Sequence, residues 1–73
     1  MKSLDLKGLK CPLPALHTRK ALQALQAGSL LVVECTDPMS VIDIPHLVRE
    51  RGDKLENSVA RTDGIYVFHI RRV

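Results

Sequence analysis

Cys11 is the residue of this sequence with the clearest capacity for chemistry. It begins the run Cys11-Pro12-Leu13-Pro14, which stands directly before a stretch of strong helix formers. A thiol attacks as its thiolate, and the pKa of a free cysteine, about 8.5, falls when the sulfur lies at a helix N-terminus. We therefore predict that Cys11 occupies the N-cap of this helix, with its thiolate or persulfide anion stabilised there.

The residues next to Cys11 favour a rigid and exposed sulfur. Pro12 fixes its own φ and biases Cys11 toward an extended conformation, and Pro14 stiffens the first turn. Lys10 adds a positive charge beside the expected helix dipole. Cysteine is often buried and inert, but it is a poor natural cap, which favours a functional role. We find no second thiol or base in the sequence to complete an active site beside it.

The other residues that could take part in chemistry are better explained by structural roles. Cys35 lies in an apolar, strand-like run and is expected to be a small core residue. The three histidines, His17, His46 and His69, have no metal-ligand spacing with either cysteine, so we predict no metal. Asp37 precedes a proline and is expected to cap or turn a second helix rather than to act in catalysis.

The first half of the chain predicts a strand, a helix and a second strand. Ser3 to Asp5 alternate in polarity and form a short first strand. Pro12 to Ala27 predict a helix that ends at Gly28, with Pro12 in the first turn, where its missing N–H has no partner to lose. Ser29 to Thr36 are rich in β-branched residues and predict a central strand, whose core-facing residues by the period of two are Leu31, Val33 and Cys35.

A second helix follows Asp37-Pro38. Apolar residues recur at helical spacing before Gly52, namely Val41, Ile44, Leu47 and Val48. Pro45 removes a hydrogen bond and crowds the preceding turn. We therefore expect a first turn near Pro38 and a regular helix from about Asp43 to Arg51.

The last third of the chain predicts a β-hairpin. Lys54 to Arg61 and Ile65 to Arg72 flank Thr62-Asp63-Gly64, and Asp-Gly between two strand-like runs is a strong hairpin signal. The core face of the last strand is expected to carry Tyr66, Phe68 and Ile70. The order βαβαββ predicts an α/β two-layer sandwich, with two helices on one face of a four-stranded mixed sheet.

The first helix has two apolar faces. Its main stripe at 100° per residue consists of Ala15, Thr18, Leu22 and Leu25. Leu13 and Leu16 fall on the opposite side with Lys20. The two leucines form either a docking patch for partner proteins or a contact with the second helix. Arg19 and Lys20 either steer an acidic partner or simply face solvent.

Size and composition indicate one small domain over residues 1–73. The longest aliphatic block, Leu30 to Val33, is far below the roughly 20 residues of a membrane helix, and the N-terminus lacks a signal-peptide stretch. We expect a cytoplasmic monomer with reduced thiols. The net charge of +3 is a mild bias without a dense basic stripe, which argues against direct nucleic-acid binding.

Almost the whole sequence resembles the TusA/SirA/YedF family of sulfur carriers. The specific part of the resemblance is Cys-Pro-x-Pro with its flanking glycine, Gly8-Leu9-Lys10-Cys11-Pro12-Leu13-Pro14. Arg19-Lys20, Asp37-Pro38, Asp43-Ile44-Pro45 and a terminal hairpin follow as in the family. The resemblance implies the sandwich fold and a persulfide on Cys11, with no other cofactor.

The resemblance also implies protein partners. Cys11 would be loaded by a cysteine desulfurase or a rhodanese-like donor and unloaded to a downstream acceptor protein. Family members serve tRNA thiolation, molybdenum-cofactor assembly or sulfur oxidation, and members acting in tRNA thiolation often carry an acidic residue where Leu13 stands here. Two alternatives remain open from the residues alone: a thiol-based redox enzyme, and a regulatory nucleic-acid-binding module.

Overall fold

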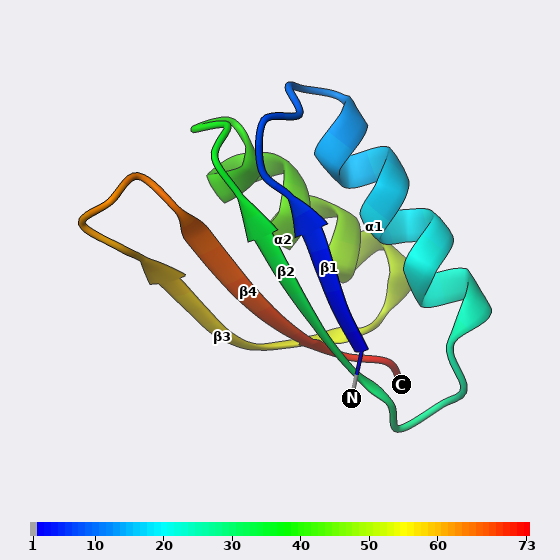
Figure 1. Cartoon of the computed structure of the whole chain (residues 1–73). Coiled ribbons are helices and arrows are strands. Elements are labelled where there is room, and N and C mark those ends of the chain that lie inside the picture. The colour runs from blue at the N-terminus through cyan, green and yellow to red at the C-terminus, as the bar shows by residue number, and fades with distance from the viewer. Residues whose placement is uncertain (1) are drawn as a thin grey trace.

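The computed structural model describes residues 2–73 and has two layers, a four-stranded sheet and two helices that cover one of its faces (Figure 1). The elements in chain order are β1 (Lys2–Leu6), α1 (Leu13–Ala24), β2 (Leu30–Cys35), α2 (Ser40–Arg51), β3 (Lys54–Ala60) and β4 (Tyr66–Arg71). The spatial order of the strands is β1-β2-β4-β3. β1 is parallel to β2, and the other pairs are antiparallel. The predicted mixed-sheet sandwich is thereby confirmed.

The core lies between the sheet and the helices. The predicted core face of β2 is confirmed, because Leu31, Val33 and Cys35 are fully buried. In β4, Phe68 and Ile70 are buried in the same cluster and Tyr66 packs against it. α1 contributes Leu22 and Thr18, and α2 contributes Ile44, Leu47 and Val48. These contacts fix both helices on the sheet and thereby set the position of the loops at their N-terminal ends.

α1 is shorter at both ends than the sequence predicts, since it spans Leu13–Ala24 rather than residues 12 to 27. At its C-terminal end the chain leaves the helix to pair with the end of β4. Gly28 donates its N–H to the carbonyl of Arg72, and Arg72 returns a hydrogen bond to the carbonyl of Ser29. The Arg72 guanidinium also donates to the Leu22 carbonyl, at 2.8 Å, near the end of the helix. These tertiary hydrogen bonds replace the last helical turn that propensity favours.

α2 begins earlier than the sequence predicts, because it is a continuous helix from Ser40 with Pro45 inside it. Asp37 starts the helix: its carbonyl accepts from both the N–H and the hydroxyl of Ser40. Of the apolar residues at helical spacing, Ile44, Leu47 and Val48 are buried, whereas Val41 is 46 % exposed. Gly52 ends the helix with a φ of 79°, in the left-handed region where glycine is favoured.

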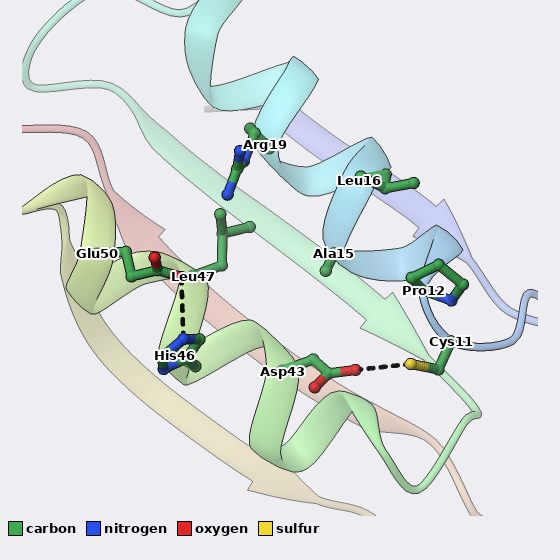
Figure 2. Close-up of a pocket in the computed structure, with 9 residues that line it drawn as sticks. All are labelled: Cys11, Pro12, Ala15, Leu16, Arg19, Asp43, His46, Leu47 and Glu50. Atoms are coloured by element: carbon green, nitrogen blue, oxygen red, sulfur yellow. Dashed lines mark hydrogen bonds and ion pairs between the residues drawn. The ribbon is translucent and has the colours of Figure 1, made fainter.

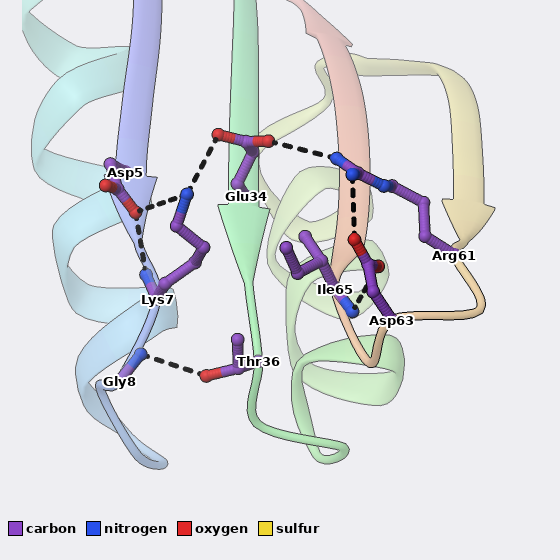
Figure 3. A network of polar contacts seen from close by, with 8 residues as sticks. All are labelled: Asp5, Lys7, Gly8, Glu34, Thr36, Arg61, Asp63 and Ile65. Carbon is purple, nitrogen blue, oxygen red and sulfur yellow. Dashed lines mark hydrogen bonds and ion pairs between the residues drawn. The ribbon is translucent and has the colours of Figure 1, made fainter.

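The predicted hairpin is confirmed, with Arg61 and Ile65 closing the turn around residues 62–64 through an N–H···O bond of 2.8 Å. The face of the sheet opposite the helices carries a chain of ion pairs at this end (Figure 3). Glu34 of β2 lies between Lys7 and Arg61, at 3.7 and 3.6 Å, and Arg61 also contacts Asp63. This face is therefore polar at the C-terminal end of β2, next to the loop that carries Cys11. None of the helices in residues 2–73 has the length and apolarity needed to cross a membrane.

Candidate functional site

The loop that carries Cys11 is attached to the end of β2. After β1 the chain turns through Gly8, whose φ of 87° requires a residue without a β-carbon penalty. Gly8 donates its N–H to the hydroxyl of Thr36 at 2.9 Å (Figure 3). Leu9 packs against the core cluster. The loop is thus anchored to β2 through Gly8 and to the core through Leu9, directly before Lys10 and Cys11.

Cys11 is not the N-cap of α1, as predicted, but the residue before it. The carbonyl that accepts the first helical hydrogen bond belongs to Pro12, from the N–H of Leu16, and this makes Pro12 the N-cap. The Cys11–Pro12 peptide bond is cis, and a turn closed by the Leu13 N–H and the Lys10 carbonyl brackets both residues. The thiol is exposed, as the sequence analysis expected.

The sulfur of Cys11 contacts a carboxylate that the sequence analysis did not place beside it. Cys11 Sγ donates to Asp43 Oδ2 at 3.0 Å, across the gap between the two helix starts (Figure 2). This hydrogen bond is the largest cause that raises the pKa of the Cys11 thiol, followed by partial desolvation and by the negative charges of Asp43 and Asp37. The prediction of a lowered pKa was therefore wrong for the resting protein, because the hydrogen bond to Asp43 and the nearby negative charges favour the neutral thiol.

Asp37 ties the Cys11 loop to the start of α2. One of its carboxylate oxygens accepts the N–H of Cys11, and the other accepts the N–H of Met39 at 3.2 Å. The predicted role of Asp37 in turning the chain into the second helix is confirmed. Its bond to Cys11 was not foreseen, because it joins residues 26 positions apart.

Asp37→Ala should lower the free energy of unfolding by about 1–2 kcal/mol, because it leaves two N–H groups without their acceptors. Urea denaturation with an unchanged m-value would measure this loss. Asp37→Asn keeps one side-chain oxygen and should lose less. Equal stability of the Asp37→Ala protein and the unmodified chain would contradict this role.

Cys11 lies at the rim of a groove between the two helices, with a volume of about 250 Å³ (Figure 2). Ala15 and Leu47 contribute apolar surface, while Arg19 of α1 faces a set of polar side chains on α2. His46 Nε2 and Glu50 Oε1 are in contact at 3.0 Å along that helix. The lining residues are Cys11, Pro12, Ala15, Leu16, Arg19, Asp43, His46, Leu47 and Glu50.

Exposed apolar side chains gather at the N-terminal ends of both helices. Five of the seven large apolar side chains that are exposed among residues 2–73 lie there, and we call them the apolar collar: Leu13, Leu16, Met39, Val41 and Ile42. Leu16 lines the groove with Cys11, and Ile42 lines an adjoining hollow that shares Asp43 and His46 with it. A monomer that exposes clustered apolar surface at one site commonly uses it for protein contacts.

Comparisons with known proteins agree on one family. The family model described as sulfurtransferase TusA matches residues 2–72. The chain belongs to the TusA family. The sulfur carrier protein TusA of Allochromatium vinosum is 42% identical over 57 residues, which cover 78% of this chain and 75% of that protein.

Two other comparisons extend over nearly the whole chain. A candidate sulfur carrier of Archaeoglobus fulgidus is 34% identical over 73 residues, covering 100% of this chain and 95% of the relative. A SirA-like protein of Desulfitobacterium hafniense has the same fold, with a TM-score of 0.85 and 22% identity over 97% of this chain and 96% of that one. Membership in the TusA family supports a sulfur carrier role and, in general terms, interaction with proteins that give and accept sulfur.

The structure separates the docking and motif residues that the sequence singled out. Leu13 and Leu16 are 42% and 54% exposed, so neither side chain is buried against the second helix. Arg19 lines the groove, whereas Lys20 is exposed and does not. Pro14 is buried in the first turn of α1, where it contributes to the helix packing as well as to the rigidity of the motif. The docking roles of these side chains stay a prediction.

Cys35 is fully buried and belongs to the core cluster, as predicted. Burial raises the pKa of its thiol. Residues 2–73 contain no group of three or more His, Cys, Asp or Glu side chains placed to hold a metal ion. Within the described part of this TusA-family chain, Cys11 is thus the exposed thiol.

Proposed function

We propose that this protein carries sulfur as a persulfide on Cys11, which it receives from a donor protein and passes to an acceptor protein. The donor is a protein that bears a cysteine persulfide, either a cysteine desulfurase or a rhodanese-like protein. The acceptor offers a thiolate that removes the outer sulfur. This proposal makes specific, for one residue, the sulfur carrier role of the TusA family.

The observation that carries the proposal is the placement of the Cys11 thiol, exposed at the rim of a groove and beside the apolar collar. An exposed nucleophile next to exposed apolar surface suits a reaction between two docked proteins. The backbone of Cys11 is held in place, because its N–H is hydrogen-bonded to Asp37 and the adjacent residues form a turn and the start of α1. Such a site can present one sulfur atom to several partners in turn.

The same placement argues against a thiol peroxidase or disulfide reductase. Those reactions need a resolving thiol or a thiolate that is abundant at neutral pH. Cys35 is buried in the core, and the carboxylate of Asp43 raises the pKa of the Cys11 thiol. The site is better suited to sulfur transfer, because in that reaction the donor protein supplies the sulfur in an activated form, as a persulfide.

The experiment is to incubate the chain with a cysteine desulfurase and free cysteine and to measure its intact mass. We expect an increase by the mass of one sulfur atom, reversed by dithiothreitol. Peptide mapping should place the added sulfur on the peptide that contains Cys11 rather than on the peptide that contains Cys35. A chain that gains no sulfur from a desulfurase or from a rhodanese-like donor would refute the proposal.

A further inference from the structure

We propose that Asp43 is a catalytic residue that accepts the proton of Cys11 when sulfur is loaded and returns it when sulfur leaves. This inference rests on the proposed function. Its basis is the hydrogen bond of 3.0 Å from Cys11 Sγ to Asp43 Oδ2. Among residues 2–73, Asp43 is the side chain that hydrogen-bonds this sulfur, and it lines the same groove.

Loading needs a base because the resting thiol is held in its protonated form. The Cys11 thiol attacks the outer sulfur of a donor persulfide, R–S–S⁻, while its proton passes to the Asp43 carboxylate. The bond between the two donor sulfurs breaks, a new S–S bond forms at Cys11, and the donor leaves as the thiolate R–S⁻. Charge is conserved, since the persulfide anion on Cys11 and the side chain of Asp43 now share one proton. Two neighbouring anions favour this shared state over full ionisation of both.

Unloading needs an acid for the complementary reason. An acceptor thiolate attacks the outer sulfur, the S–S bond at Cys11 breaks, and Cys11 becomes the leaving group. A leaving thiol of raised pKa departs slowly as a thiolate. The carboxylate that accepts the Cys11 thiol proton at 3.0 Å in the resting protein would, once protonated by loading, be next to this sulfur and able to return the proton. Protonation by Asp43 restores the resting thiol and carboxylate, which closes the cycle without any further reactant.

The position of Asp43 suits both steps. It lies near the start of α2, and its partner sulfur precedes α1, so the two groups come from separate elements that pack on one sheet. The other polar side chains of the groove are Arg19 on α1 and the contacting His46 and Glu50 on α2. Asp37 faces the backbone of Cys11 instead, with both carboxylate oxygens on N–H groups.

The Asp43→Asn variant distinguishes two possible roles of Asp43: transfer of a proton to and from Cys11, or only electrostatic repulsion of the Cys11 thiolate. Without the carboxylate, the pKa of the Cys11 thiol should fall, so its alkylation by iodoacetamide at neutral pH should accelerate severalfold, because the thiolate is then present without a base to receive its proton. The persulfide form, prepared with glutathione persulfide and quantified by mass, is then treated with cyanide, which removes the outer sulfur as thiocyanate. Loss of an acid catalyst should slow thiocyanate release from the loaded variant at least about tenfold.

The two readouts must move in opposite directions. A carboxylate that only repels the thiolate would make Cys11 a better leaving group in Asp43→Asn, and thiocyanate release would be as fast as in the unmodified chain or faster. That result, or an unchanged alkylation rate, would overturn the inference. Asp43→Glu retains a carboxyl group and should recover part of the cyanide reaction. Asp5→Asn makes the same chemical change on the opposite face of the sheet, and both of its rates should equal those of the unmodified chain.

Failure of the proposed function would look different. In that case the unmodified chain would gain no sulfur from the persulfide donors, and the comparison of Asp43 variants would never show a loaded species. Normal loading with an Asp43-independent cyanide reaction would leave the carrier function intact and remove only the proton-transfer role.

Discussion

Cys11→Ala should abolish sulfur uptake from a cysteine desulfurase, whereas Cys35→Ala should take up as much sulfur as the unmodified chain. The difference follows from access. Cys11 is exposed at the rim of the groove, and Cys35 has no exposed surface between the sheet and the helices. A donor persulfide must come within bonding distance of the attacking sulfur, which the fold permits only at Cys11. Intact mass after incubation with desulfurase and cysteine measures both variants.

Cys35→Ala also serves as the matched control for the loss of a thiol. It removes a sulfur from the core and should reduce stability, but the core cluster retains eight other buried residues and should keep the fold. Circular dichroism before the sulfur assay would verify this. Sulfur retained by Cys11→Ala, or a loss of uptake in folded Cys35→Ala, would move the carrier site away from Cys11.

Much of the fold could be predicted because its signals are local. The period of two placed Leu31, Val33 and Cys35 on one face of β2, and all three are buried. Asp63-Gly64 marked the hairpin turn between β3 and β4. The helix limits were wrong where distant partners decide them. Arg72 ends α1 early, and hydrogen bonds to the Asp37 carbonyl start α2 before Pro45.

The electrostatics of the site could not be predicted from local sequence. The helix-start position of Cys11 and the neighbouring Lys10 favoured a stabilised thiolate, yet the pKa of this thiol is raised. Its cause is Asp43, 32 residues away, which becomes a neighbour only when both helices pack on the same face of the sheet. One signal was available: the Asp43-Ile44-Pro45 segment follows the central strand, so the βαβα order brings it near the first helix start.

We expect partner proteins to dock on the apolar collar. Leu16 of α1 and Ile42 of α2 are 54% and 63% exposed. Leu16 lines the groove with Cys11, and Ile42 lines the adjoining hollow with Asp43. Burying such side chains in an interface releases ordered water and excludes solvent from the reacting sulfurs. Docking should therefore depend on the collar, whereas the intrinsic reactivity of Cys11 should depend on Asp43.

Leu16→Gln combined with Ile42→Gln should lower the rate of sulfur uptake from a limiting protein donor about a hundredfold, on the basis of about 1.4 kcal/mol for each lost anchor. Alkylation of Cys11 by iodoacetamide should stay unchanged, because neither substitution alters the charge near the sulfur. Val59→Gln removes another exposed apolar side chain, from β3 and outside the apolar collar, and uptake should stay unaffected. A double variant that accepts sulfur as fast as Val59→Gln would show that partners approach Cys11 over another surface.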